Sequence, residues 1–146
     1  YDYEGFEDRF IDRIVYLSIT YEKTGRKDLL NQISEVKIAT EEYSSALEDI
    51  ENLIDDDPNY YSPYMNRAKI RIDQADYSGA ISDATKAISL AQDGSFIYYA
   101  YYLRGLAKIN IKEDPCNDFS RVGKIMENDY YVNSNQFQKL RKKYCK

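Results

Sequence analysis

The residues that enzymes use most often for catalysis are scarce in this chain, and the amino-acid types that remain restrict its chemistry. The sequence contains no histidine, which excludes Ser-His-Asp and Cys-His catalysis and histidine-ligated zinc or iron sites. Only two cysteines are present, Cys116 and Cys145, too few for a four-thiolate zinc or iron–sulfur site. We therefore expect no metal and no cofactor.

Carboxylates offer the remaining route to catalysis. Acidic pairs such as Glu41-Glu42 are frequent, but the residues around them do not indicate a pocket. The run Asp55-Asp56-Asp57 lacks the alternating oxygen ligands, the glycine and the distal glutamate of a calcium loop, so it predicts a solvated helix end. The sequence has no phosphate-binding glycine loop and no nucleotide fingerprint. An enzyme that uses Asp or Glu with Lys is therefore a weak alternative.

Charge is distributed unevenly along the 146 residues, whose formal net charge is −5. Residues 1–60 contain 16 acidic and 6 basic side chains, a net charge of −10, and residues 61–146 contain 9 and 14, a net charge of +5. The acidic half repels phosphate, so we expect no nucleic-acid partner. No stretch approaches the ~18 uncharged apolar residues of a membrane span. The opposite charges of the two ends allow weak self-association.

An internal repeat determines the fold prediction. Six positions recur with the same displacement of 34 residues: Tyr43, Ala46, Leu47, Ile50, Leu53 and Ile54 return as Tyr77, Ala80, Ile81, Ala84, Ala87 and Ile88. Their spacing places each set on one stripe of an α-helix, with the alanines at close helix–helix contacts. A second run, residues 64–72, returns as residues 101–109. A period of this length predicts a stacked array of helical hairpins.

These residues resemble the tetratricopeptide repeat, a 34-residue helix–turn–helix unit. Residues 61–94 match at six positions of its pattern, Tyr64, Ala68, Tyr77, Ala80, Ala84 and Ala87. Residues 27–60 match less completely, because Thr40-Glu41-Glu42 replaces the usual Gly-Asp turn, so a hairpin and one continuous helix over residues 28–55 both fit. Residues 98–129 read as a degenerate third unit. The resemblance implies an all-α, right-handed α-solenoid that forms a single domain.

Helices are also predicted on both flanks of the repeats. Apolar residues spaced three or four apart predict a helix within residues 1–26 that ends at Thr24-Gly25, either as an N-terminal cap or as the tail of a further repeat. Ser62-Pro63 and Asp114-Pro115 each predict a helix start. Residues 133–146 predict a capping helix whose basic end complements the helix dipole.

In the tetratricopeptide family, peptides bind along the first helix of each hairpin, which lines the inner face of the stack. The resemblance therefore implies a non-catalytic scaffold that binds a peptide or protein segment of unknown identity. The alternative is a structural or self-associating fragment of a longer solenoid. Candidate ligand contacts are the groove positions that carry polar and aromatic side chains, Met65, Asn66, Lys69, Tyr99, Tyr102 and Leu106.

Asn66 and the neighbouring tyrosines keep a second interpretation. Asn66 either contacts a ligand or hydrogen-bonds to the backbone of a neighbouring helix. It alone matches the family members that clamp a C-terminal carboxylate, and Glu35 at a groove position would repel such an anion, so we do not expect that activity. The tyrosines Tyr98, Tyr99 and Tyr102 exceed what packing needs, so they are either core or a recognition surface.

The two cysteines are placed to meet at one end of a hairpin. Pro115-Cys116-Asn117-Asp118-Phe119 resembles a stretch common in the last repeat of bacterial proteins of the family. If the helices on either side of residues 128–133 are antiparallel, a Cys116–Cys145 bridge closes a loop of about 30 residues. The alternative is two reduced, partly buried thiols. A bridge favours an exported, periplasmic or cell-surface protein, and free thiols favour a cytoplasmic one.

Overall fold

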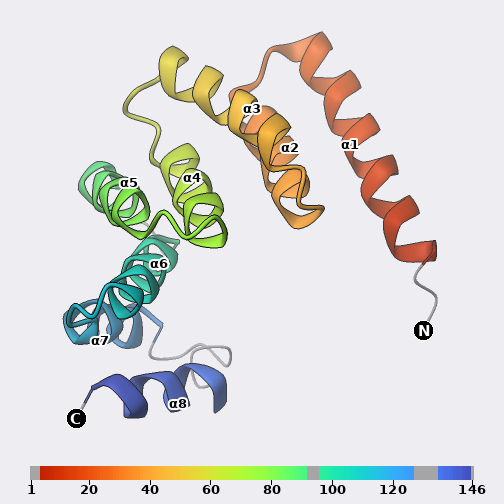
Figure 1. Cartoon of the computed structure of the whole chain (residues 1–146). Helices are drawn as coiled ribbons and strands as arrows, with labels where there is room; N and C mark the ends of the chain where they lie inside the picture. Colours follow the sequence, from red (N-terminus) through yellow and green to blue (C-terminus); the bar gives the residue numbers. More distant parts are fainter. Residues whose placement is uncertain (1–3, 92–95, 127–134, 146) are drawn as a thin grey trace. The chain divides into compact units, whose positions relative to one another are not determined.

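The computed structural model describes residues 4–91, 96–126 and 135–145, which form eight α-helices and no strand (Figure 1). Helices that follow one another in the sequence pack together, so the fold is all-α and consists of successive helical hairpins, as in an α-solenoid. The helices are α1 Glu4–Thr24, α2 Lys27–Ala39, α3 Tyr43–Asp56, α4 Tyr61–Asp73, α5 Tyr77–Leu90, α6 Ile97–Asn110, α7 Cys116–Ile125 and α8 Asn135–Tyr144.

Residues 28–55 form a hairpin, and the alternative of one continuous helix is wrong. The helix α2 ends at Ala39 and α3 begins at Tyr43, with the turn between them. The hairpins are therefore α2–α3, α4–α5 and α6–α7, and each has a first and a second helix. In the described part of the chain, no helix is both long and apolar enough to cross a membrane.

The chain divides into two compact units, residues Tyr1–Asn66 and Arg67–Lys146. The boundary lies within α4. Because residues 61–66 carry no charged side chain, the units coincide with the charge division of the sequence: the first unit carries −10 and the second +5.

In the first unit, α1 packs on α2 through apolar side chains from both helices. The buried residues of this contact are Leu17, Leu29, Ile33 and Val36. Gly25, at a φ of 63°, ends α1 in the left-handed backbone conformation, which confirms the predicted helix end. Ala46, Ile50 and Leu53 are the buried residues of α3.

In the second unit, small side chains allow the helices to approach closely. Ala68, Ala80, Ala84, Leu103 and Ala107 form one core cluster, and Phe119, Val122 and Phe137 form another. The alanines predicted at close contacts, at positions 46, 80, 84 and 87, are all fully buried. A Cβ atom on Gly105 would lie 2.4 Å from the Phe119 ring, so only glycine fits this position of α6.

The three hairpin turns share one backbone geometry. Glu41, Ala75 and Lys112 occupy equivalent positions, and each has a φ of 61–62°, in the left-handed region. In each turn the next residue donates its N–H to the carbonyl five residues earlier, for example Asp76 to Arg71 at 2.8 Å. The turn at residues 40–42 therefore has the same structure as the others although it lacks Gly-Asp.

Replacing Ala75 with glycine is expected to raise the free energy of unfolding by about 0.5–1 kcal/mol. Glycine removes the strain that an L-residue has in the left-handed conformation, and this gain exceeds the entropy that glycine adds to the unfolded chain. Urea denaturation measures the change. Lys86→Gly is the matched control in the interior of α5, where Lys86 is exposed, and we expect it to destabilise the protein by about 1 kcal/mol. A loss of stability in Ala75→Gly would contradict the turn geometry.

The structure shifts both predicted helix starts. The helix α4 begins at Tyr61, so Ser62 and Pro63 lie inside its first turn, where the missing proline N–H needs no partner. The helix α7 begins at Cys116 with Pro115 at the N-cap position, one residue later than predicted. The Asp114 carboxylate in front of it accepts a hydrogen bond from the Cys116 N–H at 2.9 Å.

Candidate functional site

The predicted ligand contacts are divided between the two units. Met65 and Asn66 belong to the first unit, and Lys69, Tyr99, Tyr102 and Leu106 belong to the second. Met65 is buried, which removes most of its side chain from contact with a ligand.

Asn66 is also buried, and it bonds to the first helix of the preceding hairpin. Its Nδ2 group donates to Asn31 Oδ1 at 3.1 Å and to Ser34 Oγ at 3.3 Å, both on α2. Of its two interpretations, the hydrogen bond to a neighbouring helix is therefore present, although it is made to side chains. This bond links first helices of successive hairpins at the positions that the family resemblance assigns to ligand binding.

The network around Asn66 ends at the carboxylate of Glu35. Asn31 Nδ2 donates to Glu35 Oε1 at 2.8 Å and to Ser62 Oγ at 3.1 Å. Asn31, Ser34 and Asn66 are buried, whereas Glu35 is exposed. We call these five residues, Asn31, Ser34, Glu35, Ser62 and Asn66, the Glu35 cluster. Its amide N–H groups donate to partners inside the cluster. The group at its surface is therefore the Glu35 carboxylate, a hydrogen-bond acceptor.

The electrostatics of the cluster follow from its partial burial. Desolvation of the Glu35 carboxyl raises its pKa above the ordinary value, and the neighbouring amides of Asn66 and Asn31 and the positive charge of Arg13 oppose that rise. The pKa of Tyr60 is raised as well, first by burial and then by the negative charge of Glu35. Burial therefore makes the charged form of both groups less favourable than in water, and the charge of Glu35 adds to this effect at the Tyr60 phenol.

In the second unit, the predicted aromatic contacts also serve the core. The rings of Tyr99 and Tyr102 stack with centroids 6.4 Å apart. Tyr102 also lies 6.4 Å from the Phe119 ring and 6.3 Å from the Phe137 ring, and burial raises its pKa. Tyr99 packs against the alanine-rich cluster. Both tyrosines are half-buried, so packing accounts for part of each ring and leaves part exposed.

The other predicted contacts of this unit are only partly available. Lys69 forms an ion pair with Asp73 one turn later on α4. Leu106 is half-buried on α6. Tyr98 packs against the cluster of Phe119 and Phe137, so for this residue the core interpretation has direct support.

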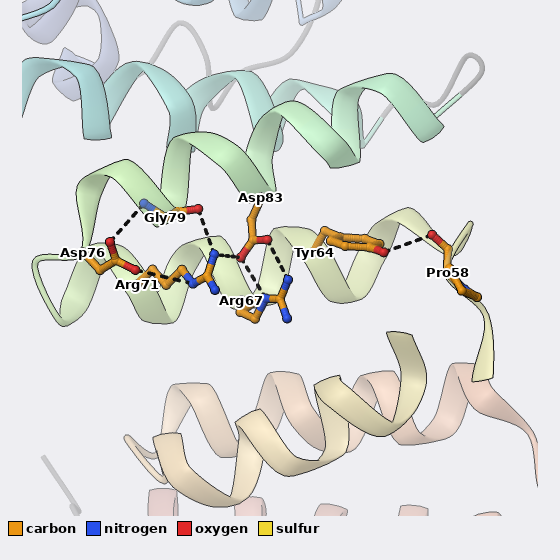
Figure 2. A network of polar contacts seen from close by, with 7 residues as sticks. All are labelled: Pro58, Tyr64, Arg67, Arg71, Asp76, Gly79 and Asp83. Atoms are coloured by element: carbon orange, nitrogen blue, oxygen red, sulfur yellow. Dashed lines mark hydrogen bonds and ion pairs between the residues drawn. The ribbon is translucent and has the colours of Figure 1, made fainter. Parts of the chain in front are cut away.

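Sequence reasoning missed a buried ion-pair network between α4 and α5 (Figure 2). Arg67 donates from Nε and Nη2 to the two Asp83 oxygens, both at 2.9 Å, and Arg71 Nη1 lies 2.8 Å from Asp83 Oδ2. Arg71 also donates to the carbonyl of Gly79 at 3.0 Å. The Asp83 side chain is 5% exposed. The network therefore fastens the two helices of one hairpin.

The same ion pair recurs in the other hairpins. In the α6–α7 hairpin, buried Asp118 pairs with Arg104 at 2.7 Å and with Lys108 at 2.8 Å. In the α2–α3 hairpin, Lys37 pairs with Asp49. A signal for it was present, because Lys37 and Asp49 each lie 34 residues before their counterparts in the α4–α5 hairpin, Arg71 and Asp83. These pairs are part of the fold and do not form a ligand site.

Figure 2 also shows how the start of α4 is fixed within the first unit. The Tyr64 hydroxyl donates to the Pro58 carbonyl at 3.0 Å, which ties the helix to the segment that follows α3. This contact helps to position Ser62 and Asn66, which lie on the same helix.

Within the described ranges, no group of three or more acidic or cysteine side chains could hold a metal ion. The arrangement that remains is a hydrogen-bonded carboxylate site on α2 and α4 and a pair of half-exposed tyrosine rings on α6. Comparisons of the chain with family models, with curated proteins and with solved structures find no match.

Proposed function

We propose that this chain is a non-catalytic interaction module that binds a basic segment of a partner protein through the Glu35 cluster on the first helices α2 and α4. The observation that carries the proposal is the Glu35 cluster, an exposed carboxylate held in place by an amide from its own helix. The resemblance to tetratricopeptide repeats supports it, because the cluster occupies positions at which that family contacts peptides.

The chemistry of the cluster selects the ligand. Each amide side chain already donates twice within the cluster, so a ligand meets the Glu35 carboxylate as an acceptor. A lysine or arginine side chain supplies the donor and the opposite charge, and such charge-assisted hydrogen bonds are about twice as strong as neutral ones. The net charge of −10 on the first unit attracts a basic segment over a longer range.

The second unit, taken by itself, offers a different kind of contact surface. Tyr99, Tyr102 and Leu106 offer half-exposed apolar surface on α6, and aromatic side chains give large contact area at low entropic cost. These three residues stay predicted contacts for apolar side chains of the ligand.

A library of unstructured decapeptides that differ in net charge tests the proposal by fluorescence anisotropy. We expect basic peptides to bind best and Glu35→Gln to weaken the best one about tenfold, because the charged hydrogen bond is lost. The matched control is Glu48→Gln, which removes the same charge from an exposed position of α3, a second helix. Equal losses in the two variants would mean unspecific attraction and would contradict the proposed site. Absence of binding by every peptide would also contradict the proposal.

The affinity for the basic peptide is expected to fall as the pH is lowered through the pKa of Glu35, which burial raises above the ordinary value of a glutamate. Below that pKa the carboxyl is neutral and no longer attracts the cationic side chain. Anisotropy titrations of the wild type and of Glu35→Gln at a series of pH values measure the effect. The variant should lack this dependence, and an identical pH profile in both proteins would rule out Glu35 as the group that titrates.

A further inference from the structure

One face of α1 exposes apolar side chains at helical spacing. Ile11, Val15 and Ile19 lie one turn apart and are 59%, 50% and 47% exposed, and Tyr16 beside them is 69% exposed. We call these four residues the α1 stripe. It adjoins the face of α1 that packs on α2, and the exposed acidic residues Asp12 and Glu22 flank it on the same helix. Contiguous exposed apolar side chains with a charged border are typical of an interaction surface.

We propose that the α1 stripe docks on α8 of a second copy of this chain, so that copies associate head to tail. The helix α8 exposes Lys139, Lys142 and Lys143 together with Tyr144. Lysine side chains can lay their apolar stems over the stripe and reach the acidic residues beside it with their ammonium groups. This interface is independent of the Glu35 cluster and of the function proposed above.

Charge decides between the two ways in which copies of this chain could cover the stripe. Pairing of two α1 stripes would bring together two units of −10 each, which repel one another. Docking on α8 brings the acidic unit of one copy to the basic unit of the next, which carries +5. Complementary charge therefore favours the head-to-tail contact over the symmetric one.

The docking surface on α8 is held in place from its other side. Phe137 and Leu140 pack in the cluster of Phe119, and the Cys116–Cys145 disulfide joins the end of α8 to the start of α7. The lysine face of α8 is therefore presented on a fixed helix, which lowers the ordering cost of association. Because the two contacting surfaces differ, the interface is heterologous and each copy keeps one surface free for a further copy.

Two variants that each disable one surface test the proposal by sedimentation equilibrium. Ile11→Lys/Ile19→Lys disables the α1 stripe, and Lys139→Glu/Lys142→Glu/Lys143→Glu disables α8. We expect the wild type to gain mass with concentration at low salt and to return to the monomer at high salt, because salt screens the charges. Each variant alone should stay monomeric. An equimolar mixture should form a dimer of twice the monomer mass, because each variant retains the surface that the other lacks.

The controls change the same charges elsewhere, and circular dichroism checks that every variant keeps its helices. Ser44→Lys/Asn52→Lys places two lysines at exposed positions of α3, and Lys86→Glu/Lys112→Glu/Lys124→Glu reverses three exposed lysines outside α8. Both controls should associate like the wild type. Three results would overturn the proposal: a wild type that is monomeric at every concentration, a mixture that stays monomeric, or an α8 variant that still dimerises and does so more strongly in salt, which indicates pairing of two α1 stripes.

Discussion

Replacing Asp83 with alanine is expected to lower the free energy of unfolding by about 3 kcal/mol, the largest effect of any single substitution considered for this chain. The carboxylate is buried between Arg67 and Arg71 and pairs with both, so its loss removes the anion that the two arginines share. Arg71 keeps the contact of its Nε with the Asp76 carboxylate at 3.6 Å. The side chains of the two arginines remain 20% and 30% exposed, so water solvates part of their charge. The expected loss of stability therefore lies at the low end of the range for buried ion pairs. Urea denaturation followed by circular dichroism measures the change.

An exposed ion pair within α4 gives the matched control for Asp83, which lies on α5. Asp73→Ala breaks the pair with Lys69 on α4 and should cost only about 0.2–1 kcal/mol. A compensated variant, Arg67→Met/Arg71→Met/Asp83→Leu, removes all three charges and should recover most of the stability, because apolar replacement of a buried ion network is often neutral or better. Equal losses at Asp73 and Asp83 would contradict the assigned role of the network.

Removing the disulfide is expected to lower the free energy of unfolding by about 3–4 kcal/mol. Cys116 and Cys145 are bonded with their Cα atoms 5.4 Å apart and a sequence separation of 29, so the bridge restricts a long loop in the unfolded chain. The double variant Cys116→Ser/Cys145→Ser avoids unpaired thiols, and denaturation of the oxidised wild type provides the reference.

Reductant separates the effect of the bridge from that of the substitutions. Adding reductant to the wild type should lower its stability to that of the double variant, whereas the variant itself should not respond. Alkylation of the purified protein without reductant should find no free thiol. Two alkylated cysteines would show that the bridge does not form in the protein. The prediction of an oxidising compartment would then be wrong as well, because it depends on the bridge.

The sequence was sufficient to predict the hairpins, because the apolar positions of their helices repeat with one displacement. The alanines at positions 46, 80, 84 and 87 identify where two helices approach closely, and all four are buried. The cysteine pairing was predicted as one of two alternatives, because the midpoint between Cys116 and Cys145 falls in the predicted loop, but spacing alone does not fix the direction of the second helix. The structure provides that direction.

The buried ion pairs were missed because the helix faces were assigned from the periodicity of apolar residues alone. In such an assignment every charged side chain is taken as exposed. Asp83 lies on the buried side of α5 only because two arginines from α4 neutralise it. To predict this burial, one has to know which helices face each other. The turn at Glu41 was uncertain for a related reason. Tertiary packing holds this residue in a conformation for which its own preference is weak.

The candidate site was only partly accessible from the sequence. Groove positions were assigned by the family resemblance, and Asn66 was among those selected. From the sequence, Glu35 was considered only as a group that repels anions. Its place in a hydrogen-bond network depends on the bond from Asn66 to Asn31, which joins two successive hairpins, and on the bond from Asn31 to Glu35. Contacts between successive hairpins do not follow from the spacing within either one. Burial of Met65 likewise became visible only with the packed helices.

Nuclear magnetic resonance of the labelled protein during titration with the best-binding basic decapeptide tests the central claim most directly. We expect the largest shifts in the side-chain amide signals of Asn31 and Asn66 and in the backbone signals of α2 and α4, because the ligand cation meets Glu35 between them. Shifts confined to the second helices α3, α5 and α7, with the amide signals of Asn31 and Asn66 unmoved, would contradict it.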